Sequence, residues 1–371
     1  FYTISTGLLT TITDPIFADF QLQQGGVTSV VEKDNRFIYT TDIEFFLGSD
    51  ASVNDGKGFD ALQFEDAEVD PDPIVRGMEI NDELYMFNAE TTEVYSNIGG
   101  TAFPYQRIKG ATIDKGLKSR FSVIEFNKSF IFLGNSIQES PAIWVTGAGT
   151  AQKLSTTSID QVIQGYSDAE LSAVHAWSYS QDGATFAGFT FPNETFVYDA
   201  TASALAGSPK WHKRQTDGIR WRVQDIVTNF GQVLVQDNQD GRNGVLSRQF
   251  ATEYDNAITR TFSTPYVFTN SDSFVISSVN LGSTSGVGIS NSDPAATPAG
   301  LNPTIELQIS KDGARTFNSH GTRAIGAEGE FEKQQVWRRL GRAAYSLILR
   351  FDTSAPVLTD FQRLDIEIKG K

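Results

Sequence analysis

The stretch that decides the fold is Ile80-Asn81-Asp82-Glu83-Leu84-Tyr85-Met86-Phe87. Asn and Asp tolerate the positive φ angles of a tight hairpin turn, so residues 81 and 82 predict a two-residue turn between antiparallel strands. Residues 84–87 are apolar and partly aromatic, and this run is too short for a helix. The stretch therefore predicts a β-hairpin.

The same unit recurs along the first two thirds of the chain. A short turn is followed by an apolar strand, a second turn and a further, mostly aromatic-rich strand, and successive units begin 46 to 55 residues apart. Repeats of about 40–50 residues with several antiparallel strands are typical of propeller blades. We therefore expect about five blades between residues 28 and 250, with first turns at Asp34-Asn35, Asn81-Asp82, Asn127-Lys128, Asp182-Gly183 and Gly231-Gln232.

The sequence leaves the total number of blades open. A closed propeller has about four to eight blades, and two sources for further strands are residues 1–27 and a segment that precedes Phe1. The chain begins with Phe and not with Met, which indicates a piece of a longer gene product or a processed chain. We therefore assign residues 1–254 to a propeller whose N-terminal blade is incomplete.

The pattern changes after Phe250. Residues 282–300 are rich in Ser, Gly, Asn and Pro and indicate a long loop. Four longer segments surround this loop, and their alternation of apolar and polar residues is typical of half-buried antiparallel strands: 274–279, 304–309, 346–351 and 363–368. The sequence thus predicts an all-β chain, a β-propeller in residues 1–254 followed by a β-sandwich in residues 255–371.

One short run has helical spacing instead. Ile159, Val162 and Ile163 share one face of a helix over residues 158–164, and Ser158 is the expected N-cap. We expect this helix to fill a gap between blades.

Composition narrows the possible functions. The chain has no Cys, which excludes disulfides, thiolate catalysis and Cys-ligated metals. The longest apolar runs fall well short of the roughly 20 residues of a membrane-spanning helix, so we expect no membrane insertion.

The formal net charge is −15, and residues 32–93 hold 17 acidic against 4 basic residues. Such a surface repels nucleic-acid phosphates.

Part of this acidity forms a cluster, the candidate acidic channel or loop surface. Its members are Glu65, Asp66, Glu68, Asp70 and Asp72. Three interpretations remain open: a solvated face, a rim past which DNA slides, and a surface that meets a basic partner. Carboxylates also bind Ca²⁺ weakly, but the cluster lacks a Gly-punctuated calcium loop and two prolines interrupt it, so we favour a solvated loop.

Basic and aromatic residues alternate in two other places. The candidate subunit interface consists of Arg220, Trp221, Arg222, Trp337, Arg338, Arg339 and Arg342. Trp and Arg are enriched in protein interfaces, where Arg pairs with carboxylates. The same residue types also stack on nucleic-acid bases. Because the chain is acidic overall, we favour contacts between subunits.

No arrangement of residues predicts catalysis, a cofactor or a metal site. The three His residues lie far apart without ligand-like spacing, and none of the common nucleophile, phosphate-binding or dinucleotide motifs is present. One segment resembles the Asp-box hairpin of sialidase-type propellers, in which the Asp and Ser side chains hold a structural turn. The residues concerned are Ser310, Asp312, Gly313, Thr316 and Phe317.

Several stretches resemble a known family, the phage packaged-DNA stabilisation proteins, which are the tail-hub or nozzle proteins of short-tailed bacteriophages. They occur in order over roughly residues 35 to 370, and they include Gly58-Phe59-Asp60-Ala61-Leu62-Gln63-Phe64, Asp70-Pro71-Asp72-Pro73-Ile74-Val75, Phe103-Pro104-Tyr105-Gln106-Arg107-Ile108, the run 158–166 and Val336-Trp337-Arg338-Arg339-Leu340-Gly341-Arg342.

The resemblance implies a non-enzymatic protein of the virion tail. Such proteins form a hexameric ring below the adaptor, or head-to-tail connector, and continue the DNA exit channel. They retain the packaged genomic DNA, which lies in the lumen without tight or sequence-specific binding, and they anchor a tail needle, fibres or tailspikes.

The alternative from a different class is a sialidase-like propeller that acts on or binds surface glycans. A stable ring in native mass spectrometry favours the first, and a monomer that cleaves or binds oligosaccharide favours the second.

Overall fold

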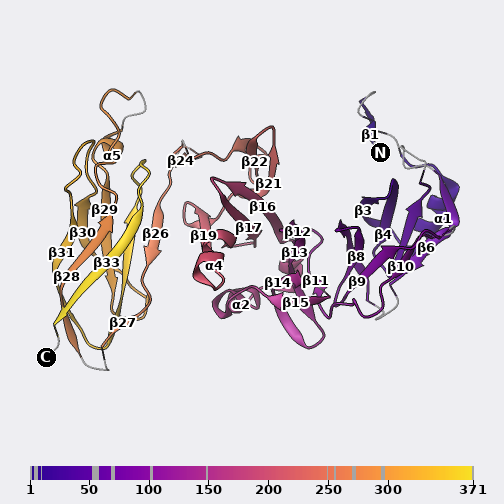
Figure 1. Ribbon diagram of the computed structural model, residues 1–371, viewed down its shortest axis with the longest axis horizontal. Helices are drawn as coiled ribbons and strands as arrows, with labels where there is room; N and C mark the ends of the chain where they lie inside the picture. The colour runs from indigo at the N-terminus through magenta and orange to yellow at the C-terminus, as the bar shows by residue number, and fades with distance from the viewer. Residues whose placement is uncertain are drawn as a thin grey trace. The chain divides into compact units, whose positions relative to one another are not determined.

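The computed structural model describes residues 2–3, 7–9, 11–51, 58–67, 72–100, 103–147, 149–248, 250–254, 256–269, 273–293 and 297–369. The chain divides into two compact units, Phe1–Leu246 (unit 1) and Ser247–Lys371 (unit 2) (Figure 1). The structure is 53% strand and 9% helix, so the all-β expectation is confirmed.

Unit 1 contains a series of antiparallel sheets that follow one another along the chain. Sheet 1 is β3 (Val27–Lys33), β4 (Arg36–Thr41), β5 (Phe45–Ser49) and β6 (Phe59–Asp66), and sheet 2 is β7 (Ile74–Ile80), β8 (Glu83–Asn88), β9 (Thr92–Asn97) and β10 (Tyr105–Arg107). Sheet 3 is β11 (Gly116–Leu117), β12 (Val123–Phe126), β13 (Ser129–Ser136), β14 (Glu139–Gly147) and β15 (Thr150–Lys153). Sheet 4 is β16 (His175–Gln181), β17 (Ala184–Thr190), β18 (Thr195–Asp199), β19 (Trp211–Thr216) and β20 (Ile219–Arg220), and sheet 5 is β21 (Val223–Asn229), β22 (Gln232–Asp237) and β23 (Asn243–Val245).

In each of these sheets, one pair of neighbouring strands is joined by a two-residue turn with positive φ at both positions. The turn residues are Asp34-Asn35, Asn81-Asp82, Asn127-Lys128, Asp182-Gly183 and Phe230-Gly231. Two positive φ angles match the right-handed twist of the flanking strands. Four turns lie where the sequence predicts them. The fifth lies one residue earlier than Gly231-Gln232, because Asn229 pairs with Gln232 and leaves Phe230 in the turn.

Consecutive sheets pack face to face, and each interface has its own apolar core. Leu84 and Phe46 belong to the core between sheets 1 and 2, Phe87 and Phe132 to that between sheets 2 and 3, and Leu133 and Phe189 to that between sheets 3 and 4. Trp177 and Val223 lie between sheets 4 and 5. The first strands also contact one another from β3 to β7, from β12 to β16 and from β16 to β21. The sheet faces that meet at these interfaces are therefore buried by their neighbours along the chain.

Helices occupy the margins of unit 1. Helix α1 (Pro15–Gln24) is capped by Asp14 and packs Phe17 and Phe20 against sheet 1. Helix α2 (Thr157–Ile163) packs Ile159 and Ile163 into the core between sheets 3 and 4, where the sequence predicts a gap-filling helix. Its N-cap is Thr156 and not the predicted Ser158, which lies inside the first turn. The sequence predicts neither α1, which occupies part of the segment 1–27 considered as a source of strands, nor the helices α3 (Asp168–Leu171) and α4 (Ala200–Ala206).

In unit 2, two antiparallel sheets pack together with one core between them. One sheet has the order β26 (Arg260–Ser263), β32 (Ser346–Thr353), β29 (Thr304–Ser310) and β30 (Asn318–Ala324), with β27 (Val267–Phe268) also paired to β32. The other has the order β31 (Gln335–Ala343), β28 (Phe274–Ser283) and β33 (Phe361–Lys369). Apolar residues of both sheets, among them Ile276, Leu307 and Phe351, share one buried cluster. This is the packing of a β-sandwich.

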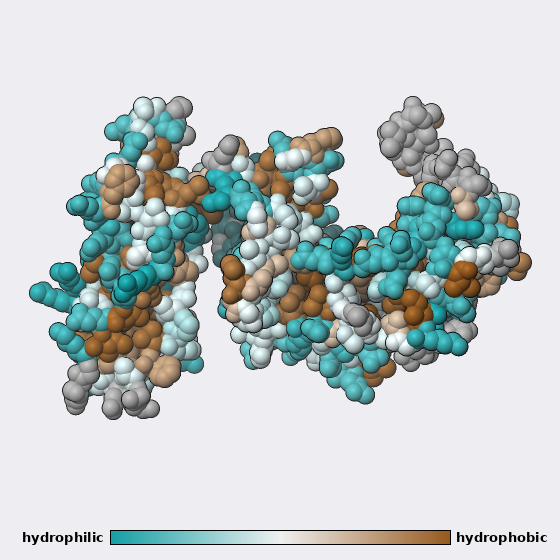
Figure 2. Space-filling model, viewed as in Figure 1, coloured by the Kyte–Doolittle hydropathy of each residue, from teal (hydrophilic) through white to brown (hydrophobic). Residues whose placement is uncertain are grey.

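The ends of the predicted loop 282–300 are regular structure instead. Strand β28 continues to Ser283, and residues Pro298–Leu301 form the short helix α5. On the visible face of unit 2, Figure 2 shows a group of hydrophobic residues framed by hydrophilic ones. Among the described helices of both units, none is long and apolar enough to cross a membrane.

Candidate functional site

The structure describes only some of the residues of the predicted acidic surface. Glu65 and Asp66 lie at the end of β6, where Glu65 is exposed and Asp66 is half-buried. Glu68 and Asp70 lie outside the described residues. Glu65 and Asp66 are therefore the described residues of this acidic surface on sheet 1. That the surface faces a channel remains a prediction.

Asp72 is not a surface residue, which corrects its assignment to the acidic surface. It is only 8% exposed. Its Oδ2 accepts the backbone N–H groups of Glu90 (2.6 Å) and Thr91 (3.0 Å), and its Oδ1 accepts the side chains of Asn88 (3.3 Å) and Thr91 (3.1 Å). A buried carboxylate with four such donors holds a turn in place. Asp72 thus fixes the connection between β8 and β9.

The two Trp residues of the predicted subunit interface are core residues, which corrects that part of the prediction. Trp337 is 0% exposed, and its Nε1 donates to the carbonyl of Gly321 at 2.8 Å. Trp221 is 4% exposed and meets the Trp177 ring edge to face at 5.4 Å. Side chains alternate between the two faces of a strand, so Trp337 points into the core while the neighbouring Arg338 points out. Neither Trp ring is accessible to a partner.

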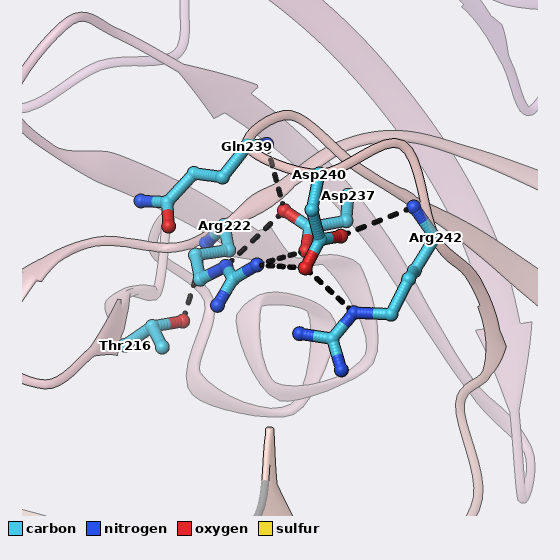
Figure 3. A network of polar contacts seen from close by, with 6 residues as sticks. All are labelled: Thr216, Arg222, Asp237, Gln239, Asp240 and Arg242. Atoms are coloured by element: carbon cyan, nitrogen blue, oxygen red, sulfur yellow. Dashed lines mark hydrogen bonds and ion pairs between the residues drawn. The ribbon is translucent and has the colours of Figure 1, made fainter.

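The described hydrogen bonds of Arg220 and Arg222 are made to other residues of unit 1. Arg220 is half-buried and donates to the Gln224 side chain at 3.0 Å. Arg222 joins the polar network of Figure 3, where its Nε donates to Asp237 Oδ1 at 3.1 Å and its Nη2 lies 3.1 Å from Asp240 Oδ2. Its Nη2 also pairs with the other oxygen of Asp237, whose side chain is only 1% exposed.

The rest of this network fastens the loop between β22 and β23. Asp240 accepts the Nε of Arg242 at 2.7 Å, and Asp237 accepts the backbone N–H of Gln239 at 2.9 Å. The backbone N–H of Arg222 donates to the Thr216 hydroxyl at 3.2 Å (Figure 3). The hydrogen bond to Asp237 raises the pKa of the Arg222 guanidinium. The network therefore ties the segment before β21 to the end of β22.

The second arginine group lies on the surface. Arg338, Arg339 and Arg342 of β31 are exposed, and we call them the β31 basic surface. Arg338 is opposite Ser278 of β28, and Arg342 is opposite Val275, which in turn is opposite Lys369 of β33. Arg339 has a φ of 60°, because the register shifts at this point and leaves an extra residue in β31. This bulge turns one arginine away from the regular alternation of the strand.

The Asp-box-like segment forms a turn held by its own side chains. Asp312 Oδ1 accepts the backbone N–H groups of Arg315 (3.1 Å) and Thr316 (3.0 Å), and its Oδ2 accepts the Thr316 hydroxyl (2.5 Å). The Ser310 hydroxyl donates to Asp312 at 2.8 Å and accepts the N–H of Ala314 at 2.9 Å. The Thr316 bonds, followed by that of Ser310, hold the pKa of Asp312 well below its ordinary value.

The remaining members of that segment shape the same turn. Gly313 has a φ of 76°, and Phe317 lies beneath Arg350, whose guanidinium carbon is 4.5 Å from the ring centre. Both oxygens of the Asp312 carboxylate thus accept hydrogen bonds from within the turn. Within the described parts of the chain, no three His, Asp or Glu side chains are grouped closely enough to hold a metal ion.

A cavity of about 660 Å³ lies among strands β7, β12, β16 and β21 of sheets 2 to 5, and no sequence motif predicts it. Its polar lining includes Arg76 from β7, Glu125 from β12 and Asp225 from β21, and its aromatic lining includes Phe121 and His175. Arg76, Glu125, His175 and Asp225 are about 50 residues apart in sequence and meet because each belongs to an edge strand of its own sheet. We call it the axial cavity.

Comparison with known proteins identifies the family. Two family models match the chain, and they describe the beta-propeller (residues 3–251) and the beta-sandwich (residues 259–369) of bacteriophage P22 Gp10. The tail hub protein gp10 of Salmonella phage P22 is 23% identical over 302 residues, covering 78% of this chain and 60% of that protein. The chain thus spans about 60% of the length of this curated relative.

Two solved structures that resemble the chain do so with low TM-scores. The computationally designed Ika8 protein gives a TM-score of 0.36 at 12% identity and covers 85% of this chain and 84% of its own. The β-propeller domain of Cps50 (Swd1) from Myceliophteria thermophila gives 0.31 at 10% identity, covering 57% of this chain and 62% of its own. Similarities of this size say nothing about function. The two family matches, in contrast, confirm the predicted propeller and sandwich, and the chain belongs to the bacteriophage P22 Gp10 family of virion tail proteins.

Proposed function

We propose that this chain is a structural component of a bacteriophage tail hub. The observation that carries the proposal is that both of its units match P22 Gp10, in the same order along the chain, and that its curated relative is a tail hub protein. The described side chains fit a structural role, because the Asp-box carboxylate and the Arg222 network are both engaged in holding loops. We propose no enzymatic activity.

In the finer form of the proposal, several copies assemble into a ring, a hexamer, around the DNA exit channel. The ring lies below the adaptor, retains the packaged genome by closing the channel, and anchors a needle, fibres or tailspikes at its far end. The net charge of −15 supports a channel wall past which DNA slides without tight binding.

The contact between copies is proposed to use opposite charges. The β31 basic surface exposes three arginines on unit 2, while residues 32–93 of unit 1 carry 17 acidic and 4 basic residues, with Glu65 exposed. A positive patch on one copy that meets a negative patch on the next fixes the register of a ring and speeds its assembly. Such head-to-tail contacts close into a ring when the rotation from one copy to the next closes after a whole number of copies.

Native mass spectrometry and negative-stain electron microscopy of the purified chain test this proposal. The wild type is expected to form a closed ring, and the triple variant R338E/R339E/R342E is expected to be monomeric with an unchanged melting temperature. The control variant K109E/K210E/K333E changes the net charge equally at exposed positions outside β31 and should retain the ring. A monomeric wild type contradicts ring formation, and a ring that survives the triple variant contradicts the interface alone.

A further inference from the structure

We infer that the outer face of unit 2 carries a binding site for a saccharide, that is, a neutral ligand whose surface is made largely of hydroxyl groups. The site is a cavity of about 390 Å³ on the sheet formed by β26, β32, β29 and β30, and we call it the sandwich cavity. It lies within unit 2 and does not depend on the tail-hub role proposed above. Its volume falls within the roughly 300–1,000 Å³ range of small-ligand sites.

A row of four polar side chains crosses this sheet and lines the sandwich cavity. Asp352 of β32 is opposite Thr261 of β26 on one side and opposite Glu306 of β29 on the other. Glu306 is in turn opposite Thr322 of β30. Opposite residues lie on the same face of a sheet, about 5 Å apart at Cβ. Phe351, next to Asp352 in sequence, points the other way into the core and is 0% exposed. The row therefore stands on a rigid, well-packed surface.

Asp352 and Arg350 are fixed by their contacts at the centre of the row. Asp352 Oδ1 accepts the Thr261 hydroxyl at 2.6 Å, and its Oδ2 accepts Nε of Arg350 at 3.1 Å. Arg350 precedes Asp352 by two residues on β32 and so lies on the same face, with its guanidinium carbon 4.5 Å from the centre of the Phe317 ring. Within the described parts of the chain, the two terminal nitrogens of Arg350 donate to no protein acceptor. They are available to a ligand in the cavity.

Glu306 is the second carboxylate of the row, and it is also held in place. Its Oε2 accepts the side-chain amide of Gln308 at 3.1 Å. Hydrogen bonds from Ser319 and then from Gln308 lower the pKa of Glu306, so its carboxylate is ionised at neutral pH. Each carboxylate oxygen has two lone-pair sites, and the described bonds leave some of them open. Glu306 and Asp352 thus offer two neighbouring hydrogen-bond acceptors to a ligand.

The composition of the lining favours a neutral ligand that is rich in hydroxyl groups. All nine lining residues are polar, and six of them carry a hydroxyl group, among them the exposed Thr304, Thr322 and Ser354. A carboxylate only accepts hydrogen bonds, a guanidinium only donates them, and a hydroxyl does both. A sugar hydroxyl both donates and accepts, so it matches all three kinds of group. Two adjacent hydroxyls of one sugar ring can donate to Glu306 and Asp352 together.

Other classes of small ligand fit this lining less well. An apolar or aromatic ligand would meet no apolar side chain among the described lining residues. An anion would face two carboxylates and a single guanidinium, whose Nε is already bonded to Asp352. A metal ion would lack a third acidic ligand, since no three His, Asp or Glu side chains are grouped for one in the described segments, and the charge of Arg350 would repel it. The saccharide remains as the best match.

The test is saturation-transfer NMR and isothermal titration of the full chain with the methyl α-glycosides of mannose, galactose, glucose and rhamnose. At least one of the four is expected to bind saturably. Glu306→Gln keeps the shape of the side chain but removes its charge, and it should weaken that binding by about tenfold. Thr322→Val removes one hydroxyl and should weaken it by about threefold. The control Glu328→Gln makes the same charge change at an exposed position of unit 2 outside the cavity and should have no effect.

Three results overturn the inference. The first is no saturable binding of any of the four glycosides to a wild type that melts cooperatively. The second is glycoside binding that Glu306→Gln and Thr322→Val leave as strong as Glu328→Gln does, which places the sugar elsewhere. The third is calcium chloride or trilysine bound more tightly than every glycoside and lost in Glu306→Gln, which indicates a site for a metal ion or a basic peptide. A melting curve is recorded for each variant, and Thr322→Val tests the site on its own if Glu306→Gln does not fold.

Discussion

Trp177 and Gly188 stand opposite each other on strands β16 and β17, and the indole ring of Trp177 covers the backbone of Gly188. A Cβ atom on Gly188 would overlap the Cη2 and Cζ2 atoms of that ring. Trp177 is only 1% exposed, and its Nε1 donates to the Thr190 hydroxyl at 3.1 Å, so the ring has little freedom to move aside. The core between sheets 4 and 5 therefore requires glycine at this position.

Gly188→Ala is expected to destabilise unit 1 by about 1–3 kcal/mol, because one added methyl group overpacks a filled core. Urea denaturation followed by tryptophan fluorescence measures the change. Gly147→Ala is the matched control: Gly147 also lies in a strand, and a Cβ there meets nothing within 4 Å. Equal stabilities of the two variants would show that the Trp177 ring moves aside to admit the added methyl group at little cost.

Asp72→Ala is expected to cost about 1–3 kcal/mol, because it leaves the N–H groups of Glu90 and Thr91 without their acceptor in a buried turn. Asp114→Ala, which removes an exposed carboxylate from the same sheet region, is expected to change the stability by less than about 0.5 kcal/mol. Thermal unfolding followed by circular dichroism distinguishes the two. A neutral Asp72→Ala variant would contradict the structural role assigned to this carboxylate.

Arg222→Met is expected to destabilise sheet 5 by about 3 kcal/mol, because the side chain of Asp237 is 1% exposed and would keep a buried charge without its partner. Adding Asp237→Asn should restore part of the loss, since the remaining group is then uncharged. A double-mutant cycle on denaturation midpoints measures this coupling. Additive effects of the two substitutions would mean that the ion pair of Figure 3 contributes nothing of its own.

Asp312 gives unit 2 a stability that depends on pH. Its pKa lies well below the ordinary value, first because of the Thr316 hydrogen bonds. A carboxyl group with a lowered folded-state pKa stabilises the fold above its unfolded pKa of about 4 and loses this contribution as the pH falls toward the folded value. Wild type should therefore exceed Asp312→Asn in melting temperature at pH 7, and the difference should shrink below about pH 4. A difference that stays constant down to pH 2 would contradict the assignment.

Phe230→Asn is expected to stabilise unit 1 by about 0.5–1 kcal/mol. Phe230 has a φ of 51°, a left-handed conformation that Asn adopts more readily than a bulky aromatic residue. Because the ring is 89% exposed, its removal loses little packing. Chemical denaturation measures the gain, and a loss of stability would indicate that the exposed ring makes contacts that stabilise the fold.

The turn preferences of Asn, Asp and Gly predict most of the hairpins, but they do not predict which side chains contact one another. Asn, Asp and Gly marked four turns correctly, since these residues have an intrinsic preference for positive φ. Phe230 has no such preference, so the sequence predicts the fifth turn one residue too late. Its φ is imposed by the pairing of Asn229 with Gln232, which is a tertiary constraint and not a local one.

The candidate sites were harder to predict for a similar reason. Clusters of Trp and Arg occur both in interfaces and in strands that have a buried and an exposed face, and Trp337 and Arg338 belong to the second kind. The burial of Asp72 depends on the β8–β9 turn that folds over it. Arg76 and Asp225 both line the axial cavity. They lie near each other because of the order of the sheets, and no sequence motif links them.

The pairing of strands also bears on the order in which the protein is made. In unit 1 most strands pair with the next strand along the chain, so each sheet is complete once its own segment of about 50 residues has left the ribosome. In unit 2, β28 pairs with β33, the 9-residue strand Phe361–Lys369. The sheet that contains β28 is therefore complete only after residues 361–369 have left the ribosome. We expect the two units to acquire their folds at different moments of synthesis, the first stepwise and the second all at once.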